Sequence, residues 1–323
     1  NKRMIEVQHL ATFVGDKLGV DDISFTVDRG EVLGFQGPNA AGKSTTMRMI
    51  TGFLPPTSGT AAVGGNDIIE NSLKARKIIG YLPVNAPAYP DMTVVGFLEF
   101  IAGIRGFSGA ARKARIEDTL ARCFLAEVRF QPISTLSKGF KQRVCFAQSI
   151  IHDPEYLIMD EPTDGLDPNQ KHQVRKLIRD MSADKAIIIS THILEEVEAV
   201  CSRAVIIAHG KLLADGTPED LLSRSPDHNA VVITVDADKA DAVKDNLQAI
   251  DTVKSTRTET GANGAKRLII RPKEGQLIAD EVSGLLRDKK IPVHEMFVDR
   301  GTLDDVFRKI TQGETSIGGK ADA

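Results

Sequence analysis

The chain has 323 residues, enough for about two domains, each with its own buried core. Lys and Arg number 41 and Asp and Glu number 44, so the formal net charge is −3 and the overall charge gives no reason to expect a nucleic-acid partner. The composition, 41% hydrophobic and 26% charged, is typical of a folded protein and excludes a largely disordered chain.

Apolar runs in the sequence are short, and none approaches the roughly 18 to 20 residues that a transmembrane helix requires. The first residues lack the long apolar stretch of a signal peptide. The cysteines, Cys123, Cys145 and Cys201, are widely spaced and form no C-x-x-C pair, which fits a reduced cytosolic protein and argues against a zinc site. We therefore expect no transmembrane helix, no signal peptide, a cytoplasmic location and three buried structural thiols.

Short runs rich in β-branched residues alternate with longer helical stretches from residue 4 to about residue 223. This alternation predicts an α/β domain with a mainly parallel sheet. Residues 91–151 lack such runs and carry apolar residues at helical spacing, which predicts a helical insertion. The charged segment 112–118 within it predicts a solvent-facing helix surface. Buried strands of the sheet are predicted at residues 32–35, 156–159, 186–189 and 204–207.

The C-terminal third of the chain has a different pattern. Residues 224–229 are polar and turn-rich and predict a linker. Residues 230–311 then give the order strand, helix, strand, strand, helix, strand, with a final helix over 302–310. This order predicts a small α+β domain of the βαββαβ type. The polar tail, 312–323, is expected to be disordered.

Residues 37–45, GPNAAGKST, fit the phosphate-loop pattern G-x-x-x-x-G-K-[ST], directly after a predicted strand and at the start of a predicted helix over 46–50. Such a loop points backbone N–H groups and the positive end of a helix at phosphates. Lys43 is expected to meet the β and γ phosphates, and the Ser44 hydroxyl to ligate Mg²⁺. The full match disfavours the alternative, an ordinary glycine-rich turn. The residues predicted to bind nucleotide here are Gly37, Asn39, Ala40, Ala41, Gly42, Lys43, Ser44 and Thr45.

Two acids follow the apolar strand at 156–159, at the carboxyl end where open α/β sheets bind ligands. Asp160 is expected to hold Mg²⁺ through water. Glu161 is expected to be the general base that orients the attacking water, because phosphoryl transfer depends mostly on positioning and electrostatics. His192 follows the next buried strand and is expected to reach the same phosphate. A helix N-terminal acid box is the alternative interpretation of the acid pair.

With these motifs the chain resembles the ATP-binding cassette (ABC) ATPases over residues 4–223. Residues 136–143, LSKGFKQR, resemble the signature sequence of that family, and residues 164–167, DGLD, resemble the loop after its catalytic glutamate. The closest resemblance is to ATPase subunits of ABC-2 type exporters, the multidrug and gliding-motility-like group. It rests on residues 81–94, on the signature stretch and on residues 302–307, TLDDVF, in the C-terminal domain.

The resemblance implies a P-loop NTPase fold and a head-to-tail dimer. In such a dimer Ser137 and Gly139 of one chain close over ATP held on the phosphate loop of the other, and Asp167 belongs to the loop beside them. It also implies an ATP-hydrolysing subunit, requiring Mg²⁺, that docks on a separate membrane permease at the inner face of the cell membrane. Pairing as a homodimer and pairing with a different ABC ATPase both remain open. The C-terminal domain is expected to be an accessory or dimer-contact module.

Three positions depart from the family pattern. Val14 stands where an aromatic residue commonly stacks on adenine, and the neighbouring Phe13 is expected to point to the other face of its strand. Ala40 replaces a glycine, which costs on the order of 1 kcal/mol if the position requires positive φ. Val84 replaces a Gln or Glu and has no oxygen for Mg²⁺ or water, while the adjacent Asn85 is expected to point elsewhere. These departures lead us to expect a slow ATPase.

Other functions compete with that of an exporter ATPase. One is a soluble ABC protein acting in translation or DNA maintenance, although the chain has neither a second cassette nor a long coiled coil. Another is a P-loop GTPase or kinase switch, which would leave the signature stretch unexplained and for which the NKxD guanine motif is absent. A third is a weakly active, nucleotide-trapping ABC subunit with a mainly regulatory role.

Overall fold

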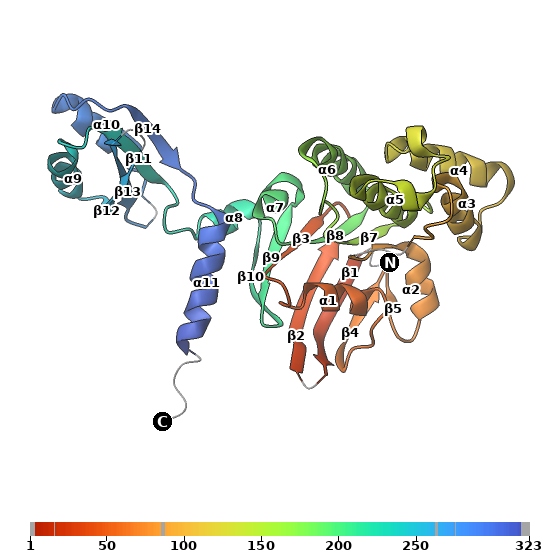
Figure 1. Cartoon of the computed structure of the whole chain (residues 1–323). Coiled ribbons are helices and arrows are strands. Elements are labelled where there is room, and N and C mark those ends of the chain that lie inside the picture. Colours follow the sequence, from red (N-terminus) through yellow and green to blue (C-terminus); the bar gives the residue numbers. More distant parts are fainter. Residues whose placement is uncertain (1–3, 16, 85–87, 262–263, 275, 318–323) are drawn as a thin grey trace. The chain divides into compact units, whose positions relative to one another are not determined.

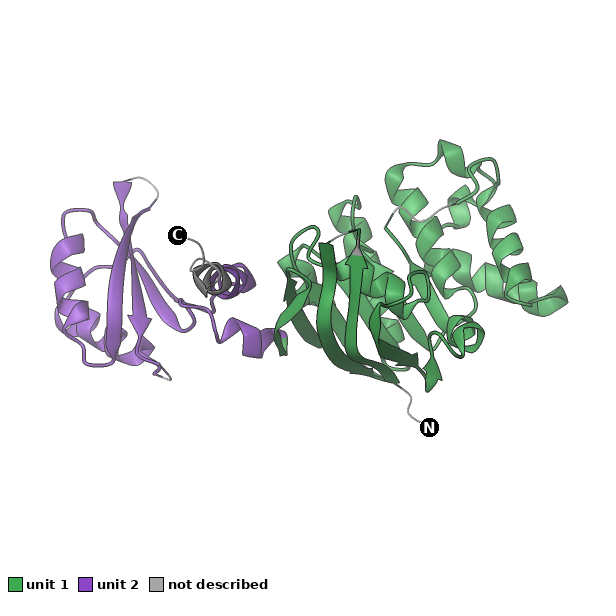
Figure 2. Ribbon diagram, turned by 90° about the horizontal axis from the view of Figure 1, so that it is seen from below, with its two compact units in different colours: residues 1–217 green, residues 218–323 purple. Residues whose placement is uncertain are grey.

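Figure 1 shows the computed structural model, which describes residues 4–15, 17–84, 88–261, 264–274 and 276–317, without the side chains of Val14 and residues 312–317. The chain divides into two compact units, Asn1–Thr217 and Pro218–Ala323 (Figure 2). The boundary lies slightly before residue 223, where the sequence predicts the first domain to end. Each unit has its own sheets and its own core.

The first unit is built on a six-stranded sheet whose strands run parallel except β10. Its order is β10-β9-β3-β8-β7-β6. The central strands are buried along their whole length, which is why they read as continuous apolar runs in the sequence. The four predicted strands are confirmed. The strands are β3 (Val32–Gln36), β6 (Ile79–Leu82), β7 (Tyr156–Asp160), β8 (Ala186–Thr191), β9 (Arg203–Ala208) and β10 (Lys211–Gly216).

A second, antiparallel sheet of order β2-β1-β4-β5 completes this unit. Its strands are β1 (Met4–Val14), β2 (Lys17–Asp28), β4 (Ser58–Val63) and β5 (Asn66–Asp67). Helix α1 (Lys43–Ile50) packs between the two sheets, and its buried Met47 and Ile50 join one core with Ile5 of β1 and Phe35 of β3. The α1 helix begins at Lys43, three residues before the predicted start at residue 46.

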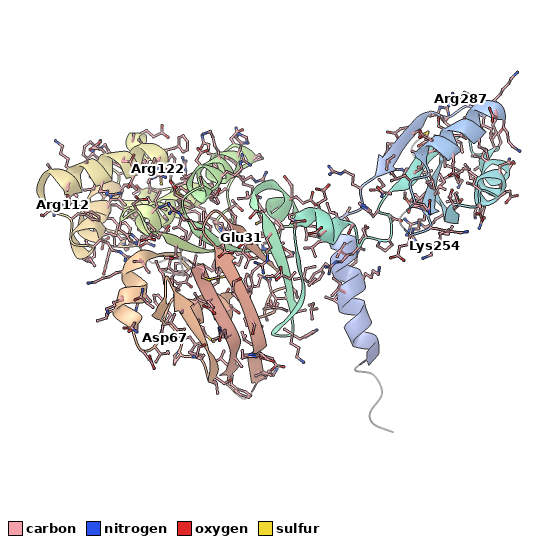
Figure 3. All side chains as sticks on the ribbon, turned by 180° about the vertical axis from the view of Figure 1, so that it is seen from behind. Glu31, Asp67, Arg112, Arg122, Lys254 and Arg287 are labelled. Carbon is pink, nitrogen blue, oxygen red and sulfur yellow. The ribbon has the colours of Figure 1, made fainter. Side chains whose placement is uncertain are left out.

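The remaining helices of the first unit include the predicted insertion, in which residues 91–151 contain helices and no strand. Arg112 lies at the outer surface of the insertion, as predicted for the charged segment (Figure 3). The helices are α2 (Ser72–Ile78), α3 (Val94–Ile104), α4 (Gly109–Arg122), α5 (Lys138–Ile150), α6 (Pro168–Ser182) and α7 (Leu194–Val200), with short 3-10 turns at Ala126–Val128 and Ile133–Thr135.

The second unit confirms the predicted βαββαβ order. Its sheet has the order β12-β13-β11-β14 with antiparallel neighbours. Val243 and Leu247 of α9 and Val282 and Leu286 of α10 pack in one core with the sheet. Its elements are α8 (Pro218–Leu222), β11 (Ala230–Val235), α9 (Ala240–Gln248), β12 (Val253–Thr260), β13 (Lys266–Pro272), α10 (Ala279–Asp288), β14 (Glu295–Asp299) and α11 (Leu303–Ile317).

Two predictions in this part of the chain need correction. Residues 224–229, predicted as a linker, belong to the second unit: Ser225 is buried, and the Asp227 carboxylate accepts a 2.5 Å hydrogen bond from Arg271 Nε. The final helix does not end at residue 310, because α11 continues to Ile317. Residues 312–317 of the predicted disordered tail are therefore helical, and residues 318–323 lie outside the described part of the chain.

The three cysteines are buried thiols, as predicted. Burial raises the pKa of Cys123 to about 12, that of Cys145 to about 11 and that of Cys201 to about 12, because a thiolate is poorly solvated in an apolar interior. Within the residues that the structure describes, no helix combines the length and the apolar character needed to cross a membrane.

We expect the folded chain to resist thiol-specific reagents at about pH 8, because the thiolate is the reactive form and all three pKa values lie well above that pH. Spectrophotometric titration with a chromogenic disulfide should detect no rapidly reacting thiol before denaturation and three afterwards. A fast-reacting thiol in the folded chain would contradict the packing around the cysteines.

Candidate functional site

The phosphate loop connects β3 to α1. Gly42 caps α1 with φ of 108°, a left-handed conformation that glycine adopts without strain. A Cβ at this position would lie 2.8 Å from the Gly19 carbonyl oxygen, so the close approach of β2 also requires glycine. No side chain caps the start of α1, which leaves its first N–H groups available for an anion.

Lys43 is the first residue of α1 and is buried. Its Nζ donates hydrogen bonds to the carbonyl oxygens of Gly37 at 2.6 Å and Pro38 at 3.0 Å, within the loop itself. Burial lowers the pKa of the Lys43 ammonium, and the charges of Glu161 and Asp160 oppose this effect. The ammonium group is therefore held over the loop by acceptors that a phosphate can replace.

Ala40 has φ of 65°, in the left-handed region. Positive φ is the condition under which the sequence analysis expects an alanine at this position to be costly. An alanine there costs about 1 kcal/mol relative to glycine because its Cβ approaches the following carbonyl.

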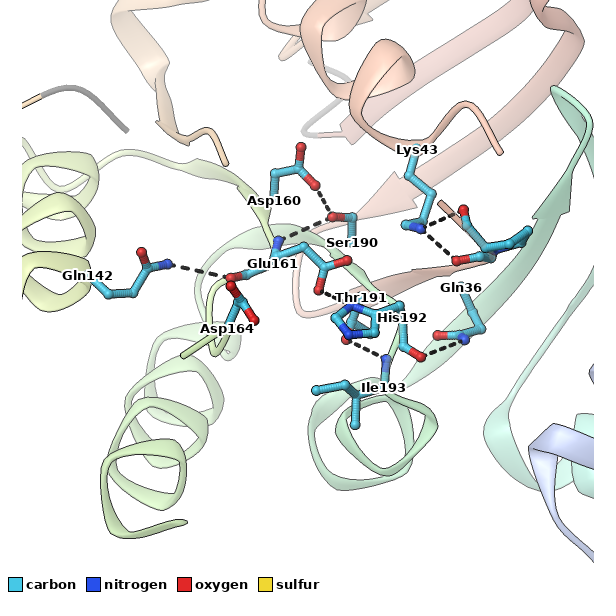
Figure 4. A network of polar contacts seen from close by, with 12 residues as sticks. Gln36, Lys43, Gln142, Asp160, Glu161, Asp164, Ser190, Thr191, His192 and Ile193 are labelled. Carbon is cyan, nitrogen blue, oxygen red and sulfur yellow. Dashed lines mark hydrogen bonds and ion pairs between the residues drawn. The ribbon is translucent and has the colours of Figure 1, made fainter. Parts of the chain in front are cut away.

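The acid pair lies at the end of β7, next to the end of β8. Ser190, which is fully buried, donates from its hydroxyl to the Asp160 carboxylate. The Glu161 N–H bonds to Ser190 in turn, 3.1 Å from its carbonyl oxygen and 3.2 Å from its hydroxyl. The Glu161 carboxylate meets His192 Nδ1 at 3.0 Å (Figure 4). The two predicted catalytic residues are thus in direct contact, and Asp160, the predicted Mg²⁺ ligand, is joined to Glu161 through Ser190.

A cavity of about 690 Å³ brings the loop and these residues together. Glu161 and His192 line it on one side, and the loop from Asn39 to Thr45 lines it on the other. Gly37 and Asp160 do not line it; Asp160 is buried and bonded to the Ser190 hydroxyl. The sequence analysis also singled out Val84, and it placed Asp164 in the loop after Glu161; both line the cavity. The further lining residues, which the sequence analysis did not identify, are Lys17, Leu18, Gly19 and Arg48.

Only some of these additional residues carried a signal in the sequence. Arg48 lies four residues after Ser44 on α1, so helical spacing places both on one face. Tyr81 does not line the cavity, but it feels the charge of Asp160. Burial, and secondarily that charge, raises the pKa of the Tyr81 hydroxyl to about 12, so the hydroxyl stays protonated. Lys17, Leu18 and Gly19 reach the cavity from β2, a strand that no motif connects to the phosphate loop.

The signature residues lie elsewhere in the same unit. Ser137 caps α5, where its hydroxyl accepts a 3.3 Å hydrogen bond from the Phe140 N–H, and it lines a separate hollow with Gln131 and Thr135. Gly139 is buried against the side chain of Gln170. Neither residue lines the nucleotide-sized cavity.

Asp167 also lies outside the cavity and caps α6. Its carboxylate accepts a 2.9 Å hydrogen bond from the Gln170 N–H, and its own N–H donates to the Gln170 side chain at 3.2 Å. This capping box accounts for Asp167 within a single chain.

The three departures from the family pattern have different outcomes. Val84 lines the cavity with 44% of its side chain exposed. Phe13 is 54% exposed and does not line the cavity, as expected from strand alternation. The side chain of Val14 and all of Asn85 lie outside the described part of the structure.

A mainly parallel sheet with a phosphate loop after β3 and an acid pair after β7, one strand removed from it, defines a P-loop ATPase cassette. The sequence bears this out, since residues 20–164 match the family model described as ABC transporter. Over 312 residues the chain is 30% identical to the Nod factor export ATP-binding protein I of Ralstonia nicotianae, covering 96% of this chain and 94% of the relative. The chain therefore belongs to the ABC transporter family.

Other relatives share mainly the first unit. The chain is 36% identical over 233 residues to the linearmycin resistance ATP-binding protein LnrL of Bacillus subtilis, covering 72% of this chain and 75% of the relative. It is 39% identical over 223 residues to the "Probable multidrug ABC transporter ATP-binding protein YbhF" of Escherichia coli, covering 69% of this chain. The match spans 38% of the length of YbhF.

Solved structures agree with the fold of the first unit. A structure described as the ATP binding subunit of an ABC transporter superposes with a TM-score of 0.63 at 31% identity, covering 68% of this chain and 91% of that one. The cbiO1 protein of Clostridium perfringens, described as part of the ABC transporter complex cbiONQ, gives a TM-score of 0.62 at 27% identity, covering 69% and 92%. The ABC ATPase fold is thus confirmed.

We expect Ala40→Gly to stabilise the chain by up to about 1 kcal/mol, because glycine adopts positive φ without the Cβ clash. The matched control is Ala41→Gly at the next position, where φ is not positive and glycine should destabilise by about 0.5–1 kcal/mol. Urea unfolding followed by circular dichroism measures both. Equal effects of the two substitutions would contradict the strain at Ala40.

Proposed function

We propose that this chain is the ATP-binding and ATP-hydrolysing subunit of an ABC-type exporter and works with a separate membrane permease. The observation that carries the proposal is the single cavity in which the phosphate loop with Lys43 faces Glu161 and His192. Its volume lies within the range of small-molecule sites. The family relationship supports the same activity.

The triphosphate would bind along the loop. Backbone N–H groups of the first turn of α1 would donate to phosphate oxygens, and the helix dipole favours the negative charge. The Lys43 ammonium would exchange its bonds to the loop carbonyls of Gly37 and Pro38 for bonds to the β and γ phosphates. A phosphate charge also offsets the cost of burying Lys43.

The donor set fits Mg²⁺ brought in with the nucleotide. Ser44 supplies a hydroxyl in the cavity, and Asp160 supplies one carboxylate behind it. Among the described residues no group of three or more His, Cys, Asp and Glu side chains could hold a metal alone. This scarcity suits Mg²⁺, which keeps several waters and takes its other ligands from phosphate. When bound, the ion would neutralise phosphate charge.

Glu161 would orient and deprotonate the attacking water. Its carboxylate lines the cavity and is held at 3.0 Å by His192 Nδ1. Fixing the carboxylate in one orientation lowers the cost of aligning the water with the γ phosphate, since phosphoryl transfer depends on positioning. His192 itself also lines the cavity and can contact the γ phosphate.

Two copies would complete each site. Ser137 opens the 13-residue α5, and neither Ser137 nor Gly139 faces the cavity of its own chain. In a head-to-tail dimer these residues would meet the γ phosphate held by the other copy, where the helix N-terminus stabilises its charge. ATP would hold the dimer closed, and hydrolysis would remove the bridging group.

The permease contact is assigned to the helical insertion. The rings of Tyr89 and Phe100 pack at 5.5 Å between centroids, and both rings are partly exposed. Ile104, one turn after Phe100 on α3, is 66% exposed. Exposed apolar side chains at neighbouring positions favour a protein contact over solvent. The export relatives indicate that the permease belongs to an exporter, which would hold the chain at the inner face of the cell membrane.

A slow, nucleotide-trapping subunit with a mainly regulatory role is the second candidate. Val84 favours it, because an apolar side chain lines the cavity where the family pattern has an oxygen ligand. Val84 cannot hold the attacking water or Mg²⁺, so binding would be affected less than hydrolysis.

We expect the purified chain to hydrolyse ATP in a Mg²⁺-dependent reaction. Glu161→Gln should lower kcat by at least about 100-fold while ATP binding persists, because it removes the general base. Val84→Gln should raise kcat, because it restores an oxygen to the cavity. Phosphate release measures the rates, and light scattering measures ATP-dependent dimerisation.

A parent chain that neither binds nor hydrolyses ATP, with no gain from Val84→Gln, would contradict the ATPase proposal. Tight binding without turnover, relieved by Val84→Gln, would establish the nucleotide-trapping candidate instead.

We also expect Ser190→Ala to raise the Mg²⁺ concentration needed for half-maximal hydrolysis by about 10- to 100-fold, because Asp160 loses the hydroxyl that orients it. Ser202→Ala is the matched control, since the Ser202 hydroxyl bonds the backbone of Val32 at the opposite end of β3. A Mg²⁺ dependence that is the same in both variants would contradict the role of Ser190.

A further inference from the structure

The first two turns of α5 lie against the loop that carries Glu161 in the same chain. The Gln142 side-chain amide donates to the carbonyl oxygen of Glu161 at 3.4 Å (Figure 4). It also donates to the carbonyl oxygen of Pro162 at 3.4 Å. Lys138 Nζ lies 3.2 Å from the carboxylate of Asp164, another residue that lines the cavity. Two side chains of α5 therefore contact the loop between β7 and α6 at separate points.

Glycines permit this close packing. A Cβ at Gly139 would lie 2.5 Å from Gln170 Oε1, the atom that completes the cap of α6. A Cβ at Gly165 would lie 2.4 Å from Lys138 Cε. Both ends of the loop between β7 and α6 are thus in contact with α5. If α5 shifted along this loop, its side chains would collide with the loop.

Glu161 requires such support because its backbone is strained. Its φ is 51°, a left-handed conformation that non-glycine residues rarely adopt. Ser190 of β8 fixes its N–H, and His192 fixes its carboxylate. The carbonyl oxygen is the remaining polar group; it accepts from the Asp164 N–H at 3.1 Å within the loop, and the Gln142 amide at 3.4 Å is its contact from α5.

We infer that Gln142 is a positioning residue for Glu161, and that α5 thereby couples its own N-terminus to hydrolysis in the cavity of its own chain. The inference rests on the proposed function, in which Ser137 and Gly139 contact nucleotide on a second copy. Because α5 reaches the loop through Gln142 and Lys138, a nucleotide engaged at its first turn changes the alignment of Glu161.

Gln142→Met keeps the length of the side chain and removes only the amide. We expect kcat to fall at least about tenfold while the Kd of a fluorescent ATP analogue changes less than twofold, because the catalytic carboxylate loses its alignment and the phosphate loop is untouched. The matched control is Gln148→Met on the same helix, where the amide donates to the Tyr81 carbonyl at 3.1 Å. That control should keep kcat within about twofold of the parent.

Gln142→Glu tests the inference through the pH dependence of kcat, which would not change if Gln142 only stabilised the fold. Its carboxylate would repel the two carbonyl oxygens, whereas the protonated acid can donate to one of them. The neighbouring oxygens raise the pKa of such a carboxyl above its ordinary value of about 4.3. The ratio of variant to parent kcat should therefore rise as pH falls from about 8 to about 6. A flat ratio, or equal losses in Gln142→Met and Gln148→Met, would overturn the inference.

Hydrogen exchange separates failure of this inference from failure of the proposed function. Without nucleotide, the peptide covering residues 160–167 should exchange faster in Gln142→Met than in the parent and in Gln148→Met. Faster exchange supports the inference even if the parent proves inactive. Unchanged exchange overturns it even if the parent is an efficient ATPase.

Discussion

The parallel pairing of β3, β8 and β7 is the constraint on which the whole site depends. In this register Gln36 lies opposite Thr191, and Asp160 lies opposite Ser190. All three strands therefore end at the same edge of the sheet, where the phosphate loop, the acids and His192 emerge together. A register shift of one residue in a fully buried strand would place polar side chains in the core. The apolar packing of the strands therefore maintains the geometry of the site.

Two non-glycine residues at this edge of the sheet have a strained, left-handed backbone. Ala40 and Glu161 both have positive φ, at the two sides of the cavity. Glu161 is held by Ser190 at its N–H, by His192 at its carboxylate, and by the Asp164 N–H and the Gln142 amide at its carbonyl. Such convergence is what allows a strained backbone to persist. Fixation of this kind also reduces the reorganisation needed when a phosphoryl group is transferred.

Much of this fold and site could be predicted from local patterns. The buried strands appear as short β-branched runs, and the phosphate loop and the acids after β7 are contiguous motifs, so neighbouring residues alone specify them. The helical insertion and the βαββαβ order of the second unit follow from periodicity in the same way. Polarity alone was a poorer guide: the turn-rich segment 224–229 is packed in the second unit, and α11 extends through polar residues to Ile317.

The sequence by itself determined the class of protein, four buried strands of the first unit, the βαββαβ order of the second unit and the match of residues 37–45 to a phosphate loop, because each depends on residues close together in the chain. Only the tertiary structure decided that Ser190 joins Asp160 to Glu161, that β2 lines the cavity and that Gln142 of α5 supports Glu161. These contacts join different strands and helices, and the physical reason is that such pairings follow from strand register and helix packing, which a linear pattern does not record.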